Sequence, residues 1–263
     1  MSNIRMPAVA GMFYPDDRRE LQGMIRDYLE AVPAASGTEP PKAIIAPHAG
    51  YPYSGPVAAS VYRRLRPLAR TVTRVVLLGP SHRVGFYGLA ASGADSFRTP
   101  LGDVPVDKEA VAEACRLRQV QVLDQAHQME HSLEVQLPFL QELLESFRLV
   151  PLVVGDASPE EVGEVLELLW GGPETLIVIS SDLSHYHDYD TARGMDRATS
   201  DAIETLRPEA IGYDNACGRN PVNGLLHVAG KHHLKGETID LRSSGDTAGP
   251  RDAVVGYGAY AFH

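Results

Sequence analysis

Three short apolar runs in this 263-residue chain each end close to a histidine. KAIIA (42–46) leads to His48, RVVLLG (74–79) leads to His82, and TLIVISS (175–181) leads to Asp182 and His185. Runs of this length that are rich in β-branched residues are typical of strands buried on both faces of a parallel sheet. Because the carboxyl ends of parallel strands meet at one edge of a sheet, we expect these side chains to lie on the same rim.

Helical patterns separate these runs. Residues 16–32 place Leu21, Ile25 and Leu29 at four-residue spacing, as in an amphipathic helix. A fourth strand is expected over 147–155, interrupted by Pro151. Further helices are expected over 57–65, 108–118, 132–146, 159–169 and 192–206. Strands that alternate with helices imply βαβ units, so we predict an α/β fold, a three-layer α/β/α sandwich with a mixed, largely parallel central sheet.

The C-terminal part follows another pattern. ETIDLRSS and DAVVGYGAYAF flank the turn-rich GDTAGPR, which indicates an antiparallel hairpin that closes the sheet. Hydrophobic residues make up 44% of the chain and charged residues 22%, the usual balance of a globular protein. Because no internal repeat or low-complexity segment interrupts the pattern, we predict a single domain over residues 1–263.

Charge and hydropathy narrow the range of partners. Lys and Arg number 24 against 34 Asp and Glu, a formal net charge of -10 that would repel a nucleic-acid backbone. No apolar run approaches the ~20 residues of a membrane-spanning helix. The start, MSNIRMPAVAGMFYP, lacks the long apolar core of a secretory signal. We therefore expect a cytoplasmic protein with reduced cysteines, no nucleic-acid partner and no membrane segment.

The rim histidines and one cysteine are the candidates for chemistry. A single loop histidine often only hydrogen-bonds the backbone, but three at equivalent strand ends favour a shared metal or acid/base site. Cys217 precedes a helix expected to start near Pro221 and stands close to Arg219. A thiol in that position should ionise readily and could bind metal, although it could equally be a small buried residue. Cys115 lies on an apolar helical face and is expected to pack in the core.

The segment HQMEHSLEVQLPFL (127–140) adds further polar residues. His127 and His131 are four residues apart and could share a helical face, but the pattern is not the H-E-x-x-H zinc motif. Glu134 suits the first turn of a helix. We expect His131 to line a pocket rather than to bind metal. Two histidines with one thiolate or carboxylate and open positions would suit iron(II), copper or zinc.

The motifs resemble those of the Memo family, known in eukaryotes as a mediator of cell motility and in bacteria and archaea as component B of the AmmeMemoRadiSam system. The resemblance runs almost from end to end and in constant order. It is carried by PAVAGMFYP, IIAPHAGYPYSG, LLGPSH, FRTPLGD, EHSLEVQLPFL, ISSDLSHY, NACGRNP and VVGYGAYAFH.

This resemblance implies a fold similar to the catalytic subunit of class III extradiol dioxygenases, with a non-heme metal pocket at one sheet edge. The family's metal ligands fall on His48, His82 and Cys217. Its Asp and His of the S-D-x-x-H motif fall on Asp182 and His185, and His185 resembles the acid/base histidine of the dioxygenases. Either residue could orient a metal-binding histidine or move a proton on a bound substrate, and His131 would line the same pocket. The dioxygenases have a glutamate where this chain has Cys217, so their activity does not follow from the fold alone.

Two functions from different classes remain open. The first is a non-heme metal-dependent oxidoreductase that binds iron or copper, with zinc as a third choice, and acts on a small molecule while His185 relays a proton. The second is a binding, scaffold or metal-sequestering protein with a remnant pocket, in which Tyr51, Tyr53 and Arg219 would line a site for a peptide or small ligand. The resemblance also implies functional association with an AMMECR-type protein and a radical-SAM enzyme.

Overall fold

A nine-stranded mixed sheet forms the centre of the protein. The computed structural model describes residues 3–33 and 39–263, and the strand order is β10-β12-β2-β9-β3-β8-β4-β7, with β11 paired to β12. The four central strands are all parallel: β2 (Ala43–Ala46), β9 (Thr175–Ser180), β3 (Arg74–Pro80) and β8 (Arg148–Val154). The predicted mixed sheet is therefore confirmed, with its parallel part in the middle.

Antiparallel strands flank this parallel centre. β4 (Leu89–Ala91) runs antiparallel to β8 and carries β7 (Val120–Val122) at the edge. On the other side β12 (Val254–Phe262) pairs antiparallel with β2, with β11 (Gly236–Ser243) and with β10 (His185–His187). The predicted C-terminal hairpin is the β11–β12 pair. A separate three-stranded sheet contains β1 (Ile4–Arg5), β5 (Ser96–Thr99) and β6 (Gly102–Pro105).

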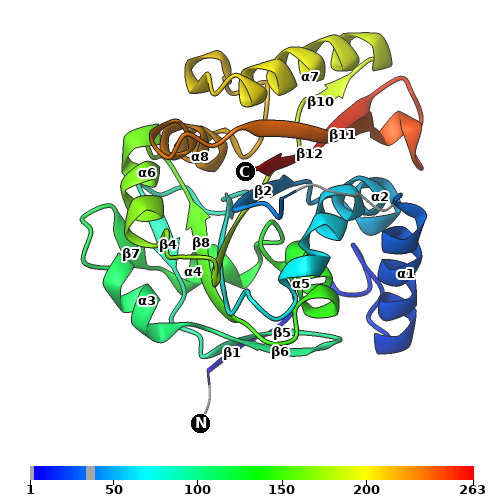
Figure 1. Cartoon of the computed structure of the whole chain (residues 1–263). Coiled ribbons are helices and arrows are strands. Elements are labelled where there is room, and N and C mark those ends of the chain that lie inside the picture. The colour runs from blue at the N-terminus through cyan, green and yellow to red at the C-terminus, as the bar shows by residue number, and fades with distance from the viewer. Residues whose placement is uncertain (1–2, 34–38) are drawn as a thin grey trace.

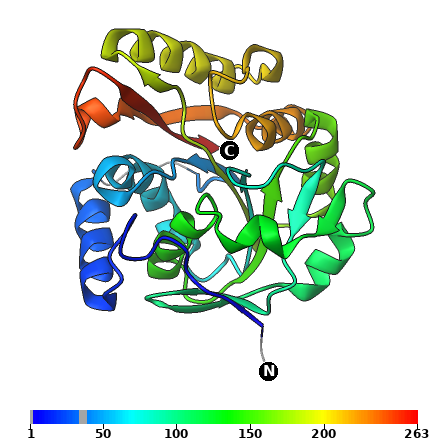
Figure 2. The same cartoon turned by 180° about the vertical axis from the view of Figure 1, so that it is seen from behind.

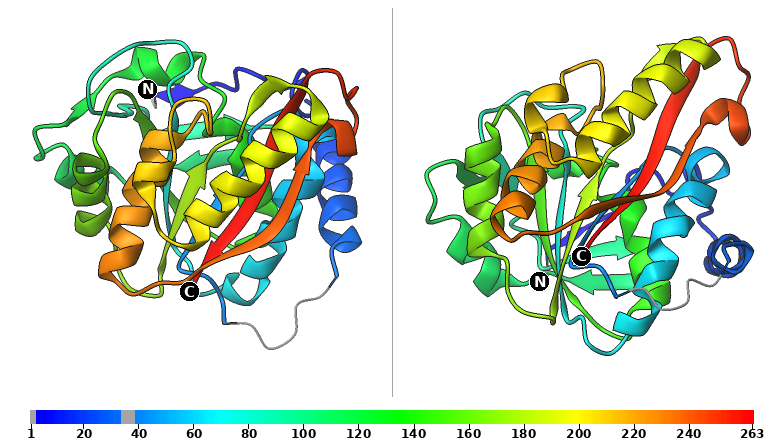
Figure 3. Two further views of the ribbon diagram at one scale, coloured as in Figure 1. Left: turned by 90° about the horizontal axis from the view of Figure 1, so that it is seen from above. Right: turned by 45° about the horizontal axis from the view of Figure 1, so that its top comes forward.

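Helices cover both faces of the large sheet, as Figures 1 and 3 show. α1, α2 and α5 lie on one face, and α6, α7 and α8 lie on the other, so the predicted three-layer arrangement is confirmed. Every residue of β2 and β9 is buried, as strands covered on both faces require. Among the described residues, no helix is both long and apolar enough to cross a membrane. The helices are α1 (Arg18–Ala31), α2 (Tyr51–Tyr62), α3 (Lys108–Ala114), α4 (Asp124–Gln128), α5 (Leu137–Leu143), α6 (Pro159–Leu168), α7 (Tyr189–Glu204) and α8 (Arg219–Lys231).

Two helices differ from their predicted limits for identifiable reasons. The helix expected over 57–65 starts at Tyr51. Pro52 lies in its first turn, where a proline is tolerated, and the helix continues through Pro56. The helix expected over 132–146 is divided into a 3₁₀ turn, η2 (Glu134–Gln136), and the short helix α5. His131 lies before η2, outside any helix.

The strand β8 runs through Pro151 without a break, although the sequence suggested an interruption there. β4 pairs with β8 only from Leu152 onward, so β8 has a single partner in the large sheet at Pro151. Proline is tolerated in strands where a ladder bond is not required of it. The short strands β1, β4, β5, β6, β7 and β10 and the helix α4 were not predicted.

The N-terminal segment is fixed to the site side of the molecule by a buried ion pair. Arg5 pairs with Glu134, and Arg5 also donates to the carbonyl of His127. The Glu134 carboxylate accepts further hydrogen bonds from the Ala8 N–H (2.7 Å) and the Tyr14 hydroxyl (2.5 Å). Figure 2 shows this dark blue segment crossing the back of the molecule. Glu134 therefore anchors a distant segment, and does more than favour a helical turn.

Candidate metal centre

Three imidazoles meet at the carboxyl edge of the parallel strands. One ring nitrogen from each of His48, His82 and His131 lies within 4.8 Å of the other two. His48 follows β2 and His82 follows β3, and their ring centroids are 5.2 Å apart. His131 comes from the turn before η2 and stacks on His82 at 4.6 Å. The parallel strands thus bring the first two histidines together, and the segment after α4 adds a third.

Hydrogen bonds fix the orientation of the His48 ring. Its Nδ1 lies 2.8 Å from the Ser180 hydroxyl, which donates its own proton to the Ser132 carbonyl (2.6 Å) and accepts from the Gln136 amide (2.7 Å). Because the single hydroxyl proton is already used, Ser180 must accept from His48 Nδ1–H. His48 Nε2 is therefore left with a free lone pair, the form in which a histidine binds metal.

Glu130 fixes the orientation of the His82 ring. Its carboxylate accepts from His82 Nδ1 (2.8 Å) and from the backbone N–H of both His82 (2.6 Å) and His131 (2.9 Å). Burial acts to raise the pKa of Glu130, but these hydrogen bonds and the nearby His82 outweigh it and hold the pKa at about 2. An ionised carboxylate only accepts, so His82 Nδ1 carries a proton and Nε2 is the ring nitrogen that could bind a metal. Carboxylates in this arrangement orient metal-binding histidines and make them more basic.

The environment keeps two of these rings uncharged at neutral pH. Burial and the neighbouring histidines lower the pKa of His48 well below its ordinary value. Burial also lowers the pKa of His131 to about 4. Neutral imidazoles with oriented lone pairs are suitable ligands for iron, copper and zinc. The residues present therefore fit a metal ion, and the donor set does not by itself identify which one.

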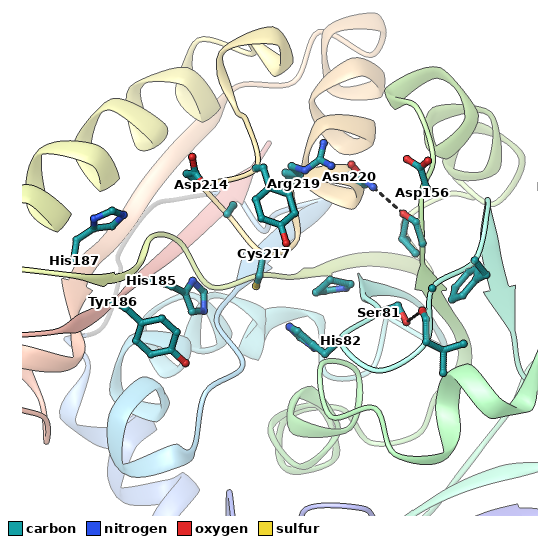
Figure 4. Close-up of a pocket in the computed structure, with 18 residues that line it drawn as sticks. Ser81, His82, Asp156, His185, Tyr186, His187, Asp214, Cys217, Arg219 and Asn220 are labelled. Atoms are coloured by element: carbon teal, nitrogen blue, oxygen red, sulfur yellow. Dashed lines mark hydrogen bonds between the residues drawn. The ribbon is translucent and has the colours of Figure 1, made fainter.

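Cys217 lies next to this cluster. Its Sγ is 3.4 Å from His48 Nε2, and the thiol donates to the Asp182 carbonyl at 3.6 Å. In Figure 4 it stands between His185 and His82. Desolvation and the Asp182 carboxylate raise the pKa of the thiol well above its ordinary value. The expectation of a readily ionised thiol is therefore wrong for the metal-free protein, since burial outweighs the helix that starts at Arg219; a bound metal would deprotonate it.

The two residues of the S-D-x-x-H motif lie in different places. Asp182 is buried, and its Oδ1 accepts the backbone N–H of His48 at 2.7 Å. Burial raises the pKa of Asp182. His185 lines an open cavity, and its Nδ1 lies 2.8 Å from the Leu183 carbonyl. Since a carbonyl can only accept, Nδ1 carries the proton and Nε2 is left to exchange a proton with a ligand.

A cavity of about 780 Å³ opens beside the cluster (Figure 4). His82, His185 and Cys217 are among its lining residues, whereas His48, His131 and Asp182 are not. Arg219 lines it, as expected. Tyr51 does not: it is buried, and its hydroxyl donates to the Val135 carbonyl. Tyr53 is also outside the lining. The aromatic lining comes instead from Phe86, Tyr186 and Tyr213.

Several predictions about the other polar residues can be decided. His127 does not share a helical face with His131, because α4 ends at Gln128; His127 is buried and bonds the Ala90 carbonyl at 2.9 Å. Cys115 packs against the core, as predicted.

The sequence alone did not identify the residues that orient the histidine rings, which are Ser180, Gln136 and Glu130. A carboxylate directly before His131 and a serine directly before the S-D-x-x-H motif were the available signals.

Comparison with known proteins agrees with the motifs. The family of Memo-like proteins matches residues 5–261. A MEMO1 family protein of Aeropyrum pernix is 40% identical, over 97% of this chain and 98% of its own. Those of Aquifex aeolicus and Sulfolobus acidocaldarius are 38% and 35% identical, each over 97% of both chains. Because the match is nearly complete in both directions, the chain belongs to the Memo family.

Proposed function

We propose that this Memo-family protein is a non-heme metalloprotein that binds iron or copper and carries out redox chemistry on a small ligand. The observation that carries the proposal is the convergence of His48, His82 and His131, with donor atoms within 4.8 Å, beside a cavity of about 780 Å³. A bound iron or copper ion would polarise oxygen or the ligand and exchange electrons with it. The remaining chemistry belongs to the side chains of the chain itself.

His48 and His82 would hold the metal with Cys217 as the third ligand. Both histidines have an oriented free Nε2, and the Cys217 sulfur is 3.4 Å from that of His48. His131 is the competing third ligand, because it completes the histidine cluster and stacks on His82. In the leading arrangement His131 would pack beside the ligands without binding the metal itself.

The proton-handling residue would be His185. It lines the cavity with Nδ1 bonded to the Leu183 carbonyl, so its Nε2 can take up or deliver a proton. Asp182 would act on the other side, by holding the backbone of His48. Glu130 would hold His82.

Metal content, measured by mass spectrometry on untagged protein purified without oxygen, tests this proposal. Wild type is compared with Cys217→Ala and His131→Ala, and Cys115→Ala serves as a thiol control outside the cluster. Near-stoichiometric iron or copper that is lost in Cys217→Ala and kept in Cys115→Ala would support the ligand set. Loss only in His131→Ala would reassign the third ligand. No metal in any of them, even after anaerobic reconstitution, would contradict the proposal.

A second candidate is a binding or metal-sequestering protein without turnover. It is favoured by the two tyrosines on the cavity rim, Tyr186 and Tyr213, whose exposures are 78% and 81%. Exposed aromatic side chains around a cavity suit a bound peptide or small ligand. Oxygen consumption by the metal-loaded protein would favour the enzyme, while ligand binding without consumption would favour the second candidate. Association with an AMMECR-type and a radical-SAM protein stays a prediction from the resemblance.

A further inference from the structure

We propose that the cavity takes a small organic acid whose carboxylate pairs with Arg219. The inference rests on the proposed function, because it names the chemical class of the ligand for the same site. It concerns a residue outside the metal cluster, and it can therefore be tested without a metal.

Arg219 is held in a defined part of the cavity wall. It is the first residue of α8 and lines the cavity next to Cys217 and Asn220 (Figure 4). The Asn220 amide donates to the Gly155 carbonyl at 2.7 Å, which ties the start of α8 to the loop after β8. The Arg219 guanidinium lies 5.4 Å from the centre of the Tyr213 ring. This wall is therefore ordered before any ligand arrives, which lowers the entropic cost of binding.

The guanidinium also lacks an acidic partner within the described part of the chain, although the chain carries a net charge of -10. Most other arginines in half-buried or buried positions do have one, Arg63 being an exception that donates to the Leu29 carbonyl. Arg5 pairs with Glu134, Arg74 with Asp107 at 2.9 Å, and Arg242 with Asp240 at 2.5 Å. A partly buried arginine keeps its charge and presents a planar fork that matches a carboxylate. Its side chain is thus available to pair with an anion that enters the cavity.

Two acidic residues share the cavity lining with Arg219 and argue in the opposite direction. Asp156 and Asp214 are both exposed to solvent, whereas Arg219 is half-buried. Exposed charges interact only weakly because water surrounds them, and salt largely screens them beyond about 10 Å at ordinary ionic strength. The attraction at Arg219 therefore outweighs the repulsion from the rim, and Asp214→Asn should strengthen anion binding slightly.

The other lining residues indicate the body of the ligand. Phe86, Tyr186 and Tyr213 are aromatic, and Val84 and Val154 are aliphatic. Aromatic rings pack best on flat apolar groups. At about 780 Å³ the cavity has the size typical of small-molecule sites. A planar acid, with its carboxylate at Arg219 and its ring toward His185 and Cys217, matches both features.

Benzoate and benzamide are the probes, because they share a shape and differ in charge. Their dissociation constants are measured by ligand-observed NMR, on the protein as purified and after chelation of metal. A charged hydrogen-bonded pair contributes about 1.5–3 kcal/mol, which corresponds to ~10-fold or more in affinity. We expect benzoate to bind at least ~10-fold tighter than benzamide, with and without metal, because the preference comes from Arg219.

Variants of Arg219 test whether this residue causes the preference for benzoate over benzamide. Arg219→Gln should abolish the preference for benzoate, and Arg219→Lys should restore part of it. Arg118→Gln removes an equal charge from an exposed position outside the cavity lining and should change nothing. Thermal unfolding of each variant checks that the fold is kept.

The proposal is overturned if benzoate shows no saturable binding, if Arg219→Gln still prefers benzoate, or if the preference disappears when the metal is removed. The last outcome would mean that the carboxylate binds the metal. A preference that survives in a protein without any metal-binding capacity would keep the Arg219 site and reject the proposed function instead. Metal binding without a benzoate preference would keep the proposed function and reject the Arg219 site.

Discussion

The histidine cluster and the cavity rim lie side by side but are stabilised differently. In the cluster, His48 and His82 each have a hydrogen-bond partner that fixes the ring, and buried carboxylates hold the backbone. On the rim, Tyr186 is 78% exposed and has a φ of 63°, a left-handed conformation that costs a non-glycine residue energy. The comparison shows that hydrogen bonds fix the rings of the histidine cluster, while the rim at Tyr186 has an exposed side chain and a strained backbone.

The largest effect on this difference in stability is expected from removing the Glu134 carboxylate, which anchors the N-terminal segment. Glu134→Ala leaves Arg5 buried without its partner and removes the acceptor for the Tyr14 hydroxyl. The expected loss in the free energy of unfolding is about 3–5 kcal/mol, measured by urea denaturation. The control is Glu145→Ala, which removes a surface pair with Arg70 and should cost at most about 1 kcal/mol. Equal effects of the two substitutions would show that the cluster side is no better stabilised than the surface.

A second test uses the pH dependence of stability. Burial lowers the pKa of His127 from 6.5 to about 4. Between these values the unfolded chain binds more protons than the folded one, so stability is full above pH 6.5 and falls as the pH drops toward 4. His127 should account for about 3 kcal/mol of this loss.

Urea denaturation at pH 4.5 and 7.5 measures that difference. His127→Gln should make the pH dependence shallower than in wild type, and His232→Gln, which removes a histidine that is paired with Glu167 near the surface, should leave it almost unchanged. A slope unchanged in His127→Gln would show that the buried ring does not titrate as described.

A third, smaller effect is expected from the orienting carboxylate. Glu130→Gln keeps the shape of the side chain but replaces the anion that accepts from His82 Nδ1. Removing such a partner typically lowers metal affinity by about 10- to 100-fold. Competition with a chelator measures the affinity. Glu167→Gln, whose carboxylate contacts His232 instead, is the matched control. Unchanged affinity in Glu130→Gln would show that the His82 ring needs no fixed partner.

The smallest effect is expected on the rim. Tyr186→Asn should relieve backbone strain, because asparagine tolerates the left-handed region better than tyrosine. The free energy of unfolding should rise by about 0.5–1 kcal/mol, and metal content should stay the same. A loss of more than about 1 kcal/mol in urea denaturation would show instead that the exposed ring contributes to packing.

The parts of the fold with strong patterns could be predicted, and the weak ones could not. The runs that became β2, β3 and β9 are continuous and apolar, so both their strands and the meeting of His48 and His82 followed from the sequence. β4 and β7 have three residues each, too few for a pattern to identify them. β4 forms by pairing with β8, and β7 by pairing with β4. Local sequence carries no such information.

The geometry of the candidate site could likewise be predicted only in part from local sequence. His131 was placed near the pocket by resemblance, but its stacking on His82 depends on the break between α4 and α5. The expected acidity of Cys217 failed because its sequence neighbours suggested a helix terminus, whereas desolvation by the folded chain decides the pKa. Effects of burial on charge require the tertiary structure.

The spacing of the proposed ligands along the chain has a consequence for biosynthesis. His48 and Cys217 are 169 residues apart. The strand that carries His48 gains its neighbour β12 only once residues 254–262 have been made. The proposed ligand set of His48, His82 and Cys217 is therefore incomplete until residue 217 has been made. If these residues bind metal as proposed, stable metal binding would follow the synthesis of Cys217 and the folding of the sheet edge.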